Sequence, residues 1–233
     1  MAEQPDLPDD PGVVGSRAQS AYRETRRRIV ELEMPPGATF TEGALAIALG
    51  MSKTPVREAL SVLAAEEFLE IMPQTGYAVR PVTLRTIHWT FDLHVLLAGR
   101  AAESLRTAPE MGDRLGTLLA ARGPGADAAQ ADAYLRSYMQ FHLAIAAHAA
   151  NRRLRTLLAR QLYHHERLVR LCLARGAQAD RLVGDDQPLV DELQAENWPA
   201  AGAAARQRLE QCRDRVLAIL ASPDQILDVA IRN

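Results

Sequence analysis

The sequence predicts a mainly α-helical chain with two folded domains, a small domain of three helices and a β-hairpin followed by an all-helical domain. Two observations support this fold class. Apolar residues recur at three- and four-residue spacing through most of the 233 residues. Strand-like patterning is confined to one short stretch, residues 68–79. A chain of this length buries one or two cores rather than a string of domains.

The charge balance excludes a protein that binds polyanions through its overall field. Lys and Arg number 27 and Asp and Glu number 29, a net charge of −2, so any contact with nucleic acid must be local. The two cysteines, Cys172 and Cys212, match no disulfide or CxxC pattern, which favours two buried thiols in a reducing cytoplasm. No apolar run is long enough to span a bilayer, so we expect no contact with a membrane.

Residues 1–15 carry four acids and three prolines without a Lys or Arg, a composition that predicts a disordered tail. The first domain is expected over residues 16–80. Its first helix begins at Ser16, where an apolar stripe at helical spacing begins, and it is expected to stop at Pro35-Pro36-Gly37.

Two further helices and a hairpin complete this domain. Thr41 starts a short helix that ends at Gly50, a residue suited to a left-handed C-cap. Ser52 then caps a second helix that runs from Lys53 to about Glu66. Short strands on either side of Pro73-Gln74-Thr75-Gly76 form the hairpin, or wing. The predicted unit is therefore a winged helix-turn-helix.

Beyond a hinge at Arg80-Pro81-Val82, residues 81–233 are expected to form an all-helical effector-binding and dimerisation domain. Gly, Pro and Asn signals divide its helical pattern. The expected helices are Thr83–Arg106, Pro109–Ala121, Ala129–Ala149, Arg152–Arg175, Leu182–Glu196 and Pro199–Leu220.

The second helix of the helix-turn-helix carries the residue types that read DNA. A helix in the major groove presents its N-terminal residues to base edges, where long cationic donors match the paired acceptors of guanine. Lys53, Thr54 and Arg57 occupy these positions, and Lys53 is the only lysine of the chain. The spacing alone equally fits a solvated helix face. The predicted DNA-binding set adds the wing tip and comprises Lys53, Thr54, Arg57, Gln74, Thr75 and Gly76.

The first domain resembles the GntR family of transcription regulators. The resemblance rests on Pro35-Pro36-Gly37, on Thr41 to Ala46, and on the string Ser52-Lys53-Thr54-Pro55-Val56-Arg57-Glu58-Ala59-Leu60. It implies that Lys53, Thr54 and Arg57 read bases or adjacent phosphates. Gly43 departs from the pattern, because many relatives carry an arginine there, so this position is expected to contact DNA weakly or not at all.

The second domain is similar to the FCD domain of the FadR-like branch, most clearly at Phe141-His142-Leu143-Ala144-Ile145-Ala146. In that family an Asp and three His often hold a divalent metal that binds a carboxylate ligand. Here Tyr138, Gln187 and Arg208 align with three of these four positions, so we expect no metal or other cofactor. The candidate effector-binding residues are His94, Tyr138, His142, Gln187 and Arg208, and a satisfied core histidine is the alternative for His142.

The expected function is a ligand-responsive, homodimeric regulator in the cytoplasm that binds a short palindromic operator. An organic acid would pair directly with Arg208. Its binding would release the protein, which acts as a repressor, from the operator. One alternative is a constitutive DNA-binding regulator whose helical domain serves only dimerisation. Another is an enzyme that uses His142 with Glu166 or Asp191, although the sequence lacks the common catalytic motifs. We therefore expect no enzymatic activity.

Overall fold

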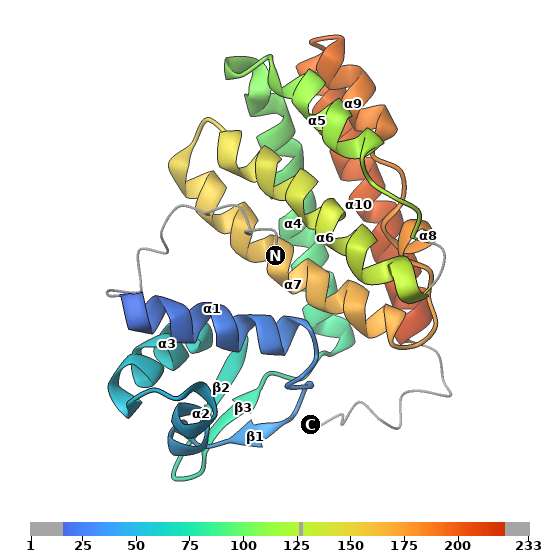
Figure 1. Cartoon of the computed structure of the whole chain (residues 1–233). Helices are drawn as coiled ribbons and strands as arrows, with labels where there is room; N and C mark the ends of the chain where they lie inside the picture. Colours follow the sequence, from blue (N-terminus) through green and yellow to red (C-terminus); the bar gives the residue numbers. More distant parts are fainter. Residues whose placement is uncertain (1–15, 126–127, 222–233) are drawn as a thin grey trace. The chain divides into compact units, whose positions relative to one another are not determined.

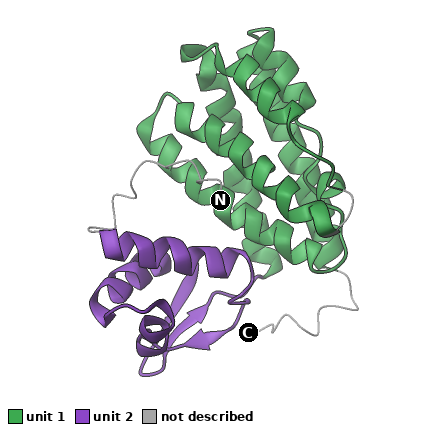
Figure 2. Cartoon of the chain, in the orientation of Figure 1, with its two compact units in different colours: residues 1–8, 83–228 green, residues 9–82, 229–233 purple. Residues whose placement is uncertain are grey.

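The computed structural model describes residues 16–125 and 128–221. The chain divides into two compact units between Val82 and Thr83, within the predicted hinge region (Figure 2). The tail predicted over residues 1–15 lies outside the described residues. No helix in the described ranges is long and apolar enough to cross a membrane.

The N-terminal unit, purple in Figure 2, contains three helices, α1 (Ser16–Val30), α2 (Glu42–Leu49) and α3 (Lys53–Ala65). The two predicted boundaries of α2 are confirmed. The Thr41 side chain accepts a hydrogen bond from the Ala44 backbone, and Gly50 closes the helix in the left-handed conformation. The predicted stop of α1 at Pro35 is wrong, because the helix ends at Val30 and Leu32 already has a φ of 63°.

A three-stranded antiparallel sheet completes this unit in the order β1-β3-β2 (Figure 1). The hairpin of β2 (Leu69–Met72) and β3 (Gly76–Val79) is the predicted wing. The sequence prediction missed β1 (Thr39–Phe40), which pairs with β3 and stacks the Phe40 ring on the Tyr77 ring. A two-residue strand has no periodic pattern, so only pairing in the folded chain defines it.

The C-terminal unit, green in Figure 2, has helices and no strand among its described residues, as predicted. Helix α4 packs against α7 and α10 and lies between them in Figure 1, so its buried face forms the middle of the domain. The elements are α4 (Leu84–Ser104), a 3-10 turn (Leu105–Thr107), α5 (Met111–Ala120), α6 (Ala128–His148), α7 (Arg152–Leu173), α8 (Ala179–Val183), α9 (Gln187–Gln194) and α10 (Trp198–Leu220).

The single helix predicted over Leu182–Glu196 is wrong, because two helices occupy this region. Helix α8 ends at Val183, and α9 begins only at Gln187. Gly184 has a φ of 82°, a conformation that L side chains rarely adopt, and it turns the chain between the two helices. This break determines where Asp186 lies.

Candidate functional site

The N-terminal half of α3 presents the three predicted DNA-reading residues to solvent. Lys53, Thr54 and Arg57 are all exposed, and 67% of the Arg57 side chain is accessible. Val56 and Leu60 of the same helix are fully buried and fix the opposite face in the domain core. The helix is therefore anchored on one side and offers one cationic face for contact.

The guanidinium group of Arg57 is held by a carboxylate from the preceding helix. Its Nε and Nη2 donate to the two carboxylate oxygens of Glu42 at 2.8 and 3.0 Å. These hydrogen bonds lower the pKa of Glu42 and raise that of Arg57. The planar pairing orients the guanidinium group, and it also offsets the charge that a phosphate would meet.

Gly43 leaves room for the neighbouring lysine. A Cβ atom at Gly43 would lie 3.6 Å from Cε and 3.9 Å from Nζ of Lys53. The Lys53 side chain thus lies over α2 beside Gly43. A longer side chain at position 43 would compete with Lys53 for this surface.

The wing tip contains two kinds of residue. Gln74 and Thr75 are exposed, which suits the predicted contact with DNA. Gly76 has a φ of 116°, and a Cβ there would lie only 2.4 Å from the carbonyl oxygen of Phe40. Gly76 therefore packs the wing against β1, and its predicted DNA contact remains untested beside this structural role.

A second constellation lies buried in the helical domain around Asp186. This carboxylate has no accessible surface, and two guanidinium groups and one imidazole lie against it. Its Oδ2 lies 2.7 Å from Nη1 of Arg122, and its Oδ1 lies 2.9 Å from Nε of Arg208 and 3.3 Å from Nε2 of His142. We call Asp186, Arg122, Arg208 and His142 the buried carboxylate cluster.

Tyr138 extends this cluster towards α7. Nη1 of Arg208 donates to the Tyr138 hydroxyl at 3.1 Å and to the carbonyl oxygen of Val183 at 3.0 Å. The same hydroxyl lies 3.1 Å from Nε2 of His165. Because the hydroxyl oxygen already accepts from an arginine, its proton is available to donate to a neutral His165.

Aromatic rings surround the other arginine of the cluster, Arg122. The ring centroids of Tyr134, Tyr138 and Phe141 lie 5.1–5.6 Å from its guanidinium carbon.

Burial keeps the imidazoles of this region neutral. Desolvation, the largest effect, lowers the pKa of His142 to about 4, although the charge of Asp186 opposes it. Desolvation also lowers the pKa of His94 and His165 well below the usual value. The pKa of Asp186 stays low despite its burial, because Arg208, His142 and Arg122 stabilise the carboxylate. Two guanidinium groups and one carboxylate therefore leave the cluster with one positive charge.

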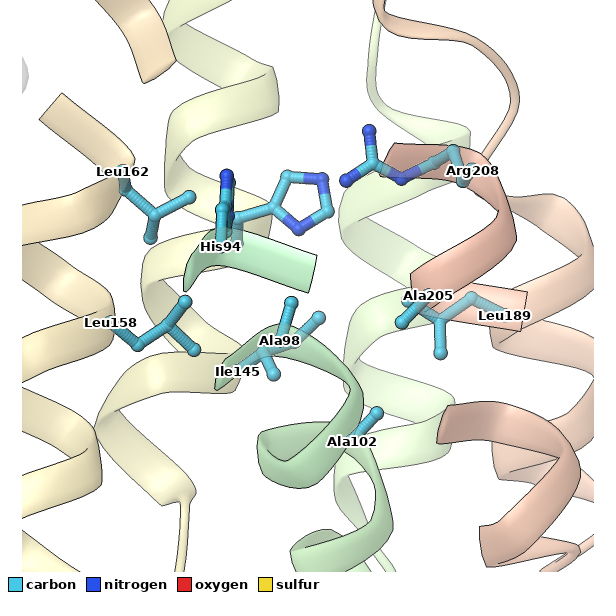
Figure 3. A pocket seen from close by; sticks show the side chains of 10 residues that line it. His94, Ala98, Ala102, Ile145, Leu158, Leu162, Leu189, Ala205 and Arg208 are labelled. Carbon is cyan, nitrogen blue, oxygen red and sulfur yellow. The ribbon is translucent and has the colours of Figure 1, made fainter. Parts of the chain in front are cut away.

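A small cavity adjoins the cluster (Figure 3). His94, His142 and Arg208 supply its polar wall. The remaining lining is apolar and consists of Ala98, Ala102, Ile145, Leu158, Leu162, Leu189 and Ala205. The space open to the centre of a water molecule is about 10 Å³, room for roughly one water. The site thus combines a cationic end with an apolar body in a nearly closed state.

The structure brings four of the five predicted effector residues together. His94, His142 and Arg208 line the cavity, and Tyr138 bonds to Arg208. The placement expected for Gln187 is wrong, because its side chain is exposed and donates to Asp191. Two residues that the sequence reasoning missed, Asp186 and Arg122, complete the cluster.

Asp186, one residue before the predicted Gln187, is the side chain that enters the buried carboxylate cluster. The acidic pair before Gln187 was the available signal, but a continuous helix over Leu182–Glu196 gave no reason to turn Asp186 inward. Arg122 directly follows the predicted helix Pro109–Ala121, and only the folded chain brings it to Asp186, 64 positions away.

The donor set does not suit a divalent metal ion. The described residues contain no group of three or more His, Cys, Asp or Glu side chains that could hold one. Asp186 and His142 are the nearest candidates, but two guanidinium groups already lie against that carboxylate. An added cation would meet their repulsion. The absence of a bound metal in solution stays a prediction.

The two pairings that an enzyme would use, His142 with Glu166 or with Asp191, are not formed among the described residues. Glu166 accepts a hydrogen bond from Arg170, and Asp191 accepts one from Gln187 at the surface. The carboxylate beside His142 is Asp186 instead.

A winged helix-turn-helix joined to a helical domain with a buried polar site defines a two-domain class of regulatory proteins. Residues 17–79 match the model of bacterial regulatory proteins of the gntR family, and residues 91–211 match the FCD domain. The chain belongs to the GntR family and carries an FCD domain, as its sequence motifs predicted. The members of this family are transcriptional regulators and not enzymes.

The relatives agree with this assignment. An uncharacterised HTH-type transcriptional regulator of Streptomyces ambofaciens is 41% identical over 61 residues, 26% of each chain. One from Agrobacterium vitis is 33% identical over 89 residues, 38% of this chain and 52% of the relative. The matches therefore span about a quarter to a half of these relatives. The structure of McbR/YncC from E. coli shares the fold with a TM-score of 0.67 at 21% identity, over 88% of this chain and 99% of that one.

Proposed function

We propose that this protein is a ligand-responsive, dimeric, sequence-specific DNA-binding regulator that acts in the cytoplasm as a repressor. The observation that supports DNA reading best is the exposed face of Lys53, Thr54 and Arg57 on a helix whose opposite face is buried. Long donors at the start of such a helix match guanine in the major groove. A single short helix reads few bases, so a two-fold pair on a palindrome supplies the remaining affinity.

Selection of bound duplexes from a random pool tests DNA reading. We expect the full chain to enrich a two-fold symmetric sequence. The variant Arg57→Ala should bind the selected duplex roughly ten- to hundred-fold more weakly, because it loses a bidentate base contact. Arg136→Ala removes an exposed arginine of α6 and serves as the matched control. Full affinity and specificity in Arg57→Ala would contradict the assignment of the reading helix.

An exposed apolar stripe on α4 supports dimerisation. Trp89, Leu93 and Leu96 lie at helical spacing on one face, with accessible fractions of 58%, 43% and 67%. Aromatic and large aliphatic side chains that remain exposed together on a helix are typical of an association surface. We assign this stripe to a second copy of the chain, since a palindromic operator requires one.

The effector proposed for the helical domain is a small organic acid. Arg208 and the neutral His94 and His142 form the polar end of an otherwise apolar cavity. A carboxylate bound there would be met by a buried guanidinium group without an intervening metal. The bound acid would shift the domain between two states and release the operator.

The nearly closed cavity favours a second candidate, a constitutive DNA-binding regulator whose helical domain serves only dimerisation. Titration of a panel of organic acids into the operator complex separates the two. A ligand-responsive repressor releases the duplex with at least one acid and loses that response in Arg208→Ala. A constitutive regulator keeps the same affinity with every acid. No thermal shift with any acid, together with unchanged operator release in Arg208→Ala, would reject the effector proposal.

A further inference from the structure

Asp186 occupies the position that the carboxylate of a bound acid would take. We propose that Asp186 is an internal ligand of the site formed by Arg122, Arg208 and His142, and that an incoming monocarboxylate switches the domain by displacing it. This inference rests on the proposed effector response and specifies how the site is regulated. The carboxylate that fills this site in the structure is the side chain of Asp186.

The first argument is that Asp186 only partly satisfies the site. Oδ1 lies 2.9 Å from Nε of Arg208 and 3.3 Å from Nε2 of His142, yet none of these three atoms makes a hydrogen bond of good geometry in the described structure. Nε and Nη2 of Arg122 also have no hydrogen-bond partner there. Buried donors left in this state cost free energy, which a better oriented carboxylate would recover.

The second argument is the segment that carries Asp186. The residue lies in the three-residue connection between α8 and α9, directly before Gln187. Its side chain caps no backbone N–H of α9. Gly184, with a φ of 82°, provides a pivot in this connection. The Asp186 carbonyl oxygen accepts from the backbone N–H groups of Leu189 and Val190, so a movement of Asp186 out of the site also moves the first turn of α9.

The third argument is electrostatic. The cluster keeps one positive charge with Asp186 in place, and two when Asp186 departs. Buried charge of this kind is strongly unfavourable without a partner, so a departing Asp186 requires a replacement anion. Exchange of one carboxylate for another conserves the charge pairing, and it moves the connection that bears Asp186.

The cavity defines the class of ligand. Its polar wall, which includes Arg208, faces a lining of alanine and branched aliphatic side chains (Figure 3). Because the cavity has room for only about one water molecule, an incoming carboxylate must take the volume that the Asp186 side chain leaves, and only a short apolar body can follow it.

The test is chemical rescue of a variant that lacks the internal carboxylate. Asp186→Ala and Asp186→Asn are compared with the wild type in the full chain, with sodium formate as the probe and sodium chloride at equal ionic strength as the reference. Asp191→Asn, at an exposed aspartate of α9, is the matched control. The readouts are the unfolding temperature and the dissociation constant for the selected operator duplex.

We expect Asp186→Ala to melt below the wild type and formate to raise its unfolding temperature by roughly 3–5 °C at ten times the dissociation constant. The wild type and Asp191→Asn should gain less than a third of this shift. Asp186→Asn is isosteric and keeps the fold testable if the alanine variant does not fold. It should show the same preference for formate over chloride.

The operator readout tests the switch itself. We expect the operator dissociation constants of the Asp186 variants to differ from that of the wild type by at least five-fold. Formate should change these constants further, because free formate can fill the site without holding the connection between α8 and α9 in place. Equal formate and chloride shifts in both variants would overturn the internal-ligand assignment. Formate rescue with wild-type operator affinity throughout would overturn the switch. If the wild type binds no operator, the DNA-reading proposal fails instead, and the melting data still decide the carboxylate site.

Discussion

At the scale of single residues, the pairing of Glu42 with Arg57 shapes the face of α3 that we propose to read DNA, formed by Lys53, Thr54 and Arg57. The carboxylate fixes the plane of the guanidinium group and also places a negative charge beside the expected phosphate path. These two effects act in opposite directions on DNA binding. Positioning favours the specific complex, whereas the charge weakens contact with any duplex.

Replacement of Glu42 separates the two effects. In Glu42→Ala we expect affinity for random duplex to rise and become more salt dependent, because one acidic charge is lost. The ratio of specific to non-specific affinity should fall by about five-fold or more, because Arg57 is no longer oriented. Fluorescence anisotropy with selected and scrambled duplexes at two salt concentrations measures both quantities. An unchanged ratio would show that Glu42 does not position Arg57.

The buried histidines predict a dependence of stability on pH. The pKa of His142 is about 4 in the folded chain, and those of His94 and His165 are also lowered. An unfolded histidine has a pKa near 6.5, so the unfolded state binds more protons as pH falls. The stabilisation is complete above pH 6.5 and is lost towards the folded-state values. For His142 we expect a loss of about 2 kcal/mol between pH 7 and pH 5.

Urea unfolding at pH 7 and pH 5 checks this expectation. His142→Gln should show a shallower pH dependence than the wild type, whatever its absolute stability. His88→Gln changes an exposed histidine of α4 and should keep the wild-type dependence. A wild-type chain whose unfolding free energy is the same at both pH values would contradict the burial of neutral imidazoles.

At the scale of elements, two glycines with positive φ differ in what surrounds them. Gly50 ends α2 with open space around its absent side chain, whereas Gly76 lies against the backbone of Phe40. Gly50→Ala should therefore destabilise the winged helix-turn-helix unit by about 1 kcal/mol, the cost of the left-handed conformation. Gly76→Ala adds a steric clash and should cost about 3 kcal/mol or more.

Thermal unfolding combined with operator binding measures this difference. We expect Gly76→Ala to lose DNA binding through the wing while formate rescue of the Asp186 variants in the same background persists. Equal destabilisation by the two substitutions would show that the close contact between Gly76 and β1 is absent in solution.

The sequence predicted most elements because long amphipathic helices have a strong period and clear end signals. Helices α4, α6, α7 and α10 lie within a few residues of their expected bounds. The errors occur where local pattern is weak, at the two-residue β1 and at the break between α8 and α9. Pairing partners and the turn at Gly184 decide those regions.

The same distinction applies to the site. His94, Tyr138, His142 and Arg208 were found through a family resemblance that fixes positions on long helices. Asp186 was missed because it lies in the irregular connection between α8 and α9. No helical period there indicates which side chain turns inward. Arg122 was missed since no local pattern reports a contact between residues 64 positions apart.

At the scale of the whole molecule, the exposed stripe of α4 should hold two chains together. Leu96→Glu places a charge on this surface and should convert the dimer to a monomer, with at least a ten-fold loss of operator affinity. Ile47→Glu, at an apolar residue of α2 that is also exposed, is the control for the change in charge and should not alter the association state. Analytical ultracentrifugation measures both. A dimer that persists in Leu96→Glu would place the interface elsewhere.

The central claim is that the buried carboxylate site and the reading helix are thermodynamically coupled. The most direct measurement is a binding cycle by calorimetry, with operator duplex titrated into the wild-type protein in the absence and presence of an acid that binds it. Coupling requires that the acid weakens operator binding by the same factor by which the operator weakens acid binding. We expect equal factors of at least five-fold, abolished in Arg208→Ala. An acid that binds at this site while the operator dissociation constant stays unchanged would contradict the claim.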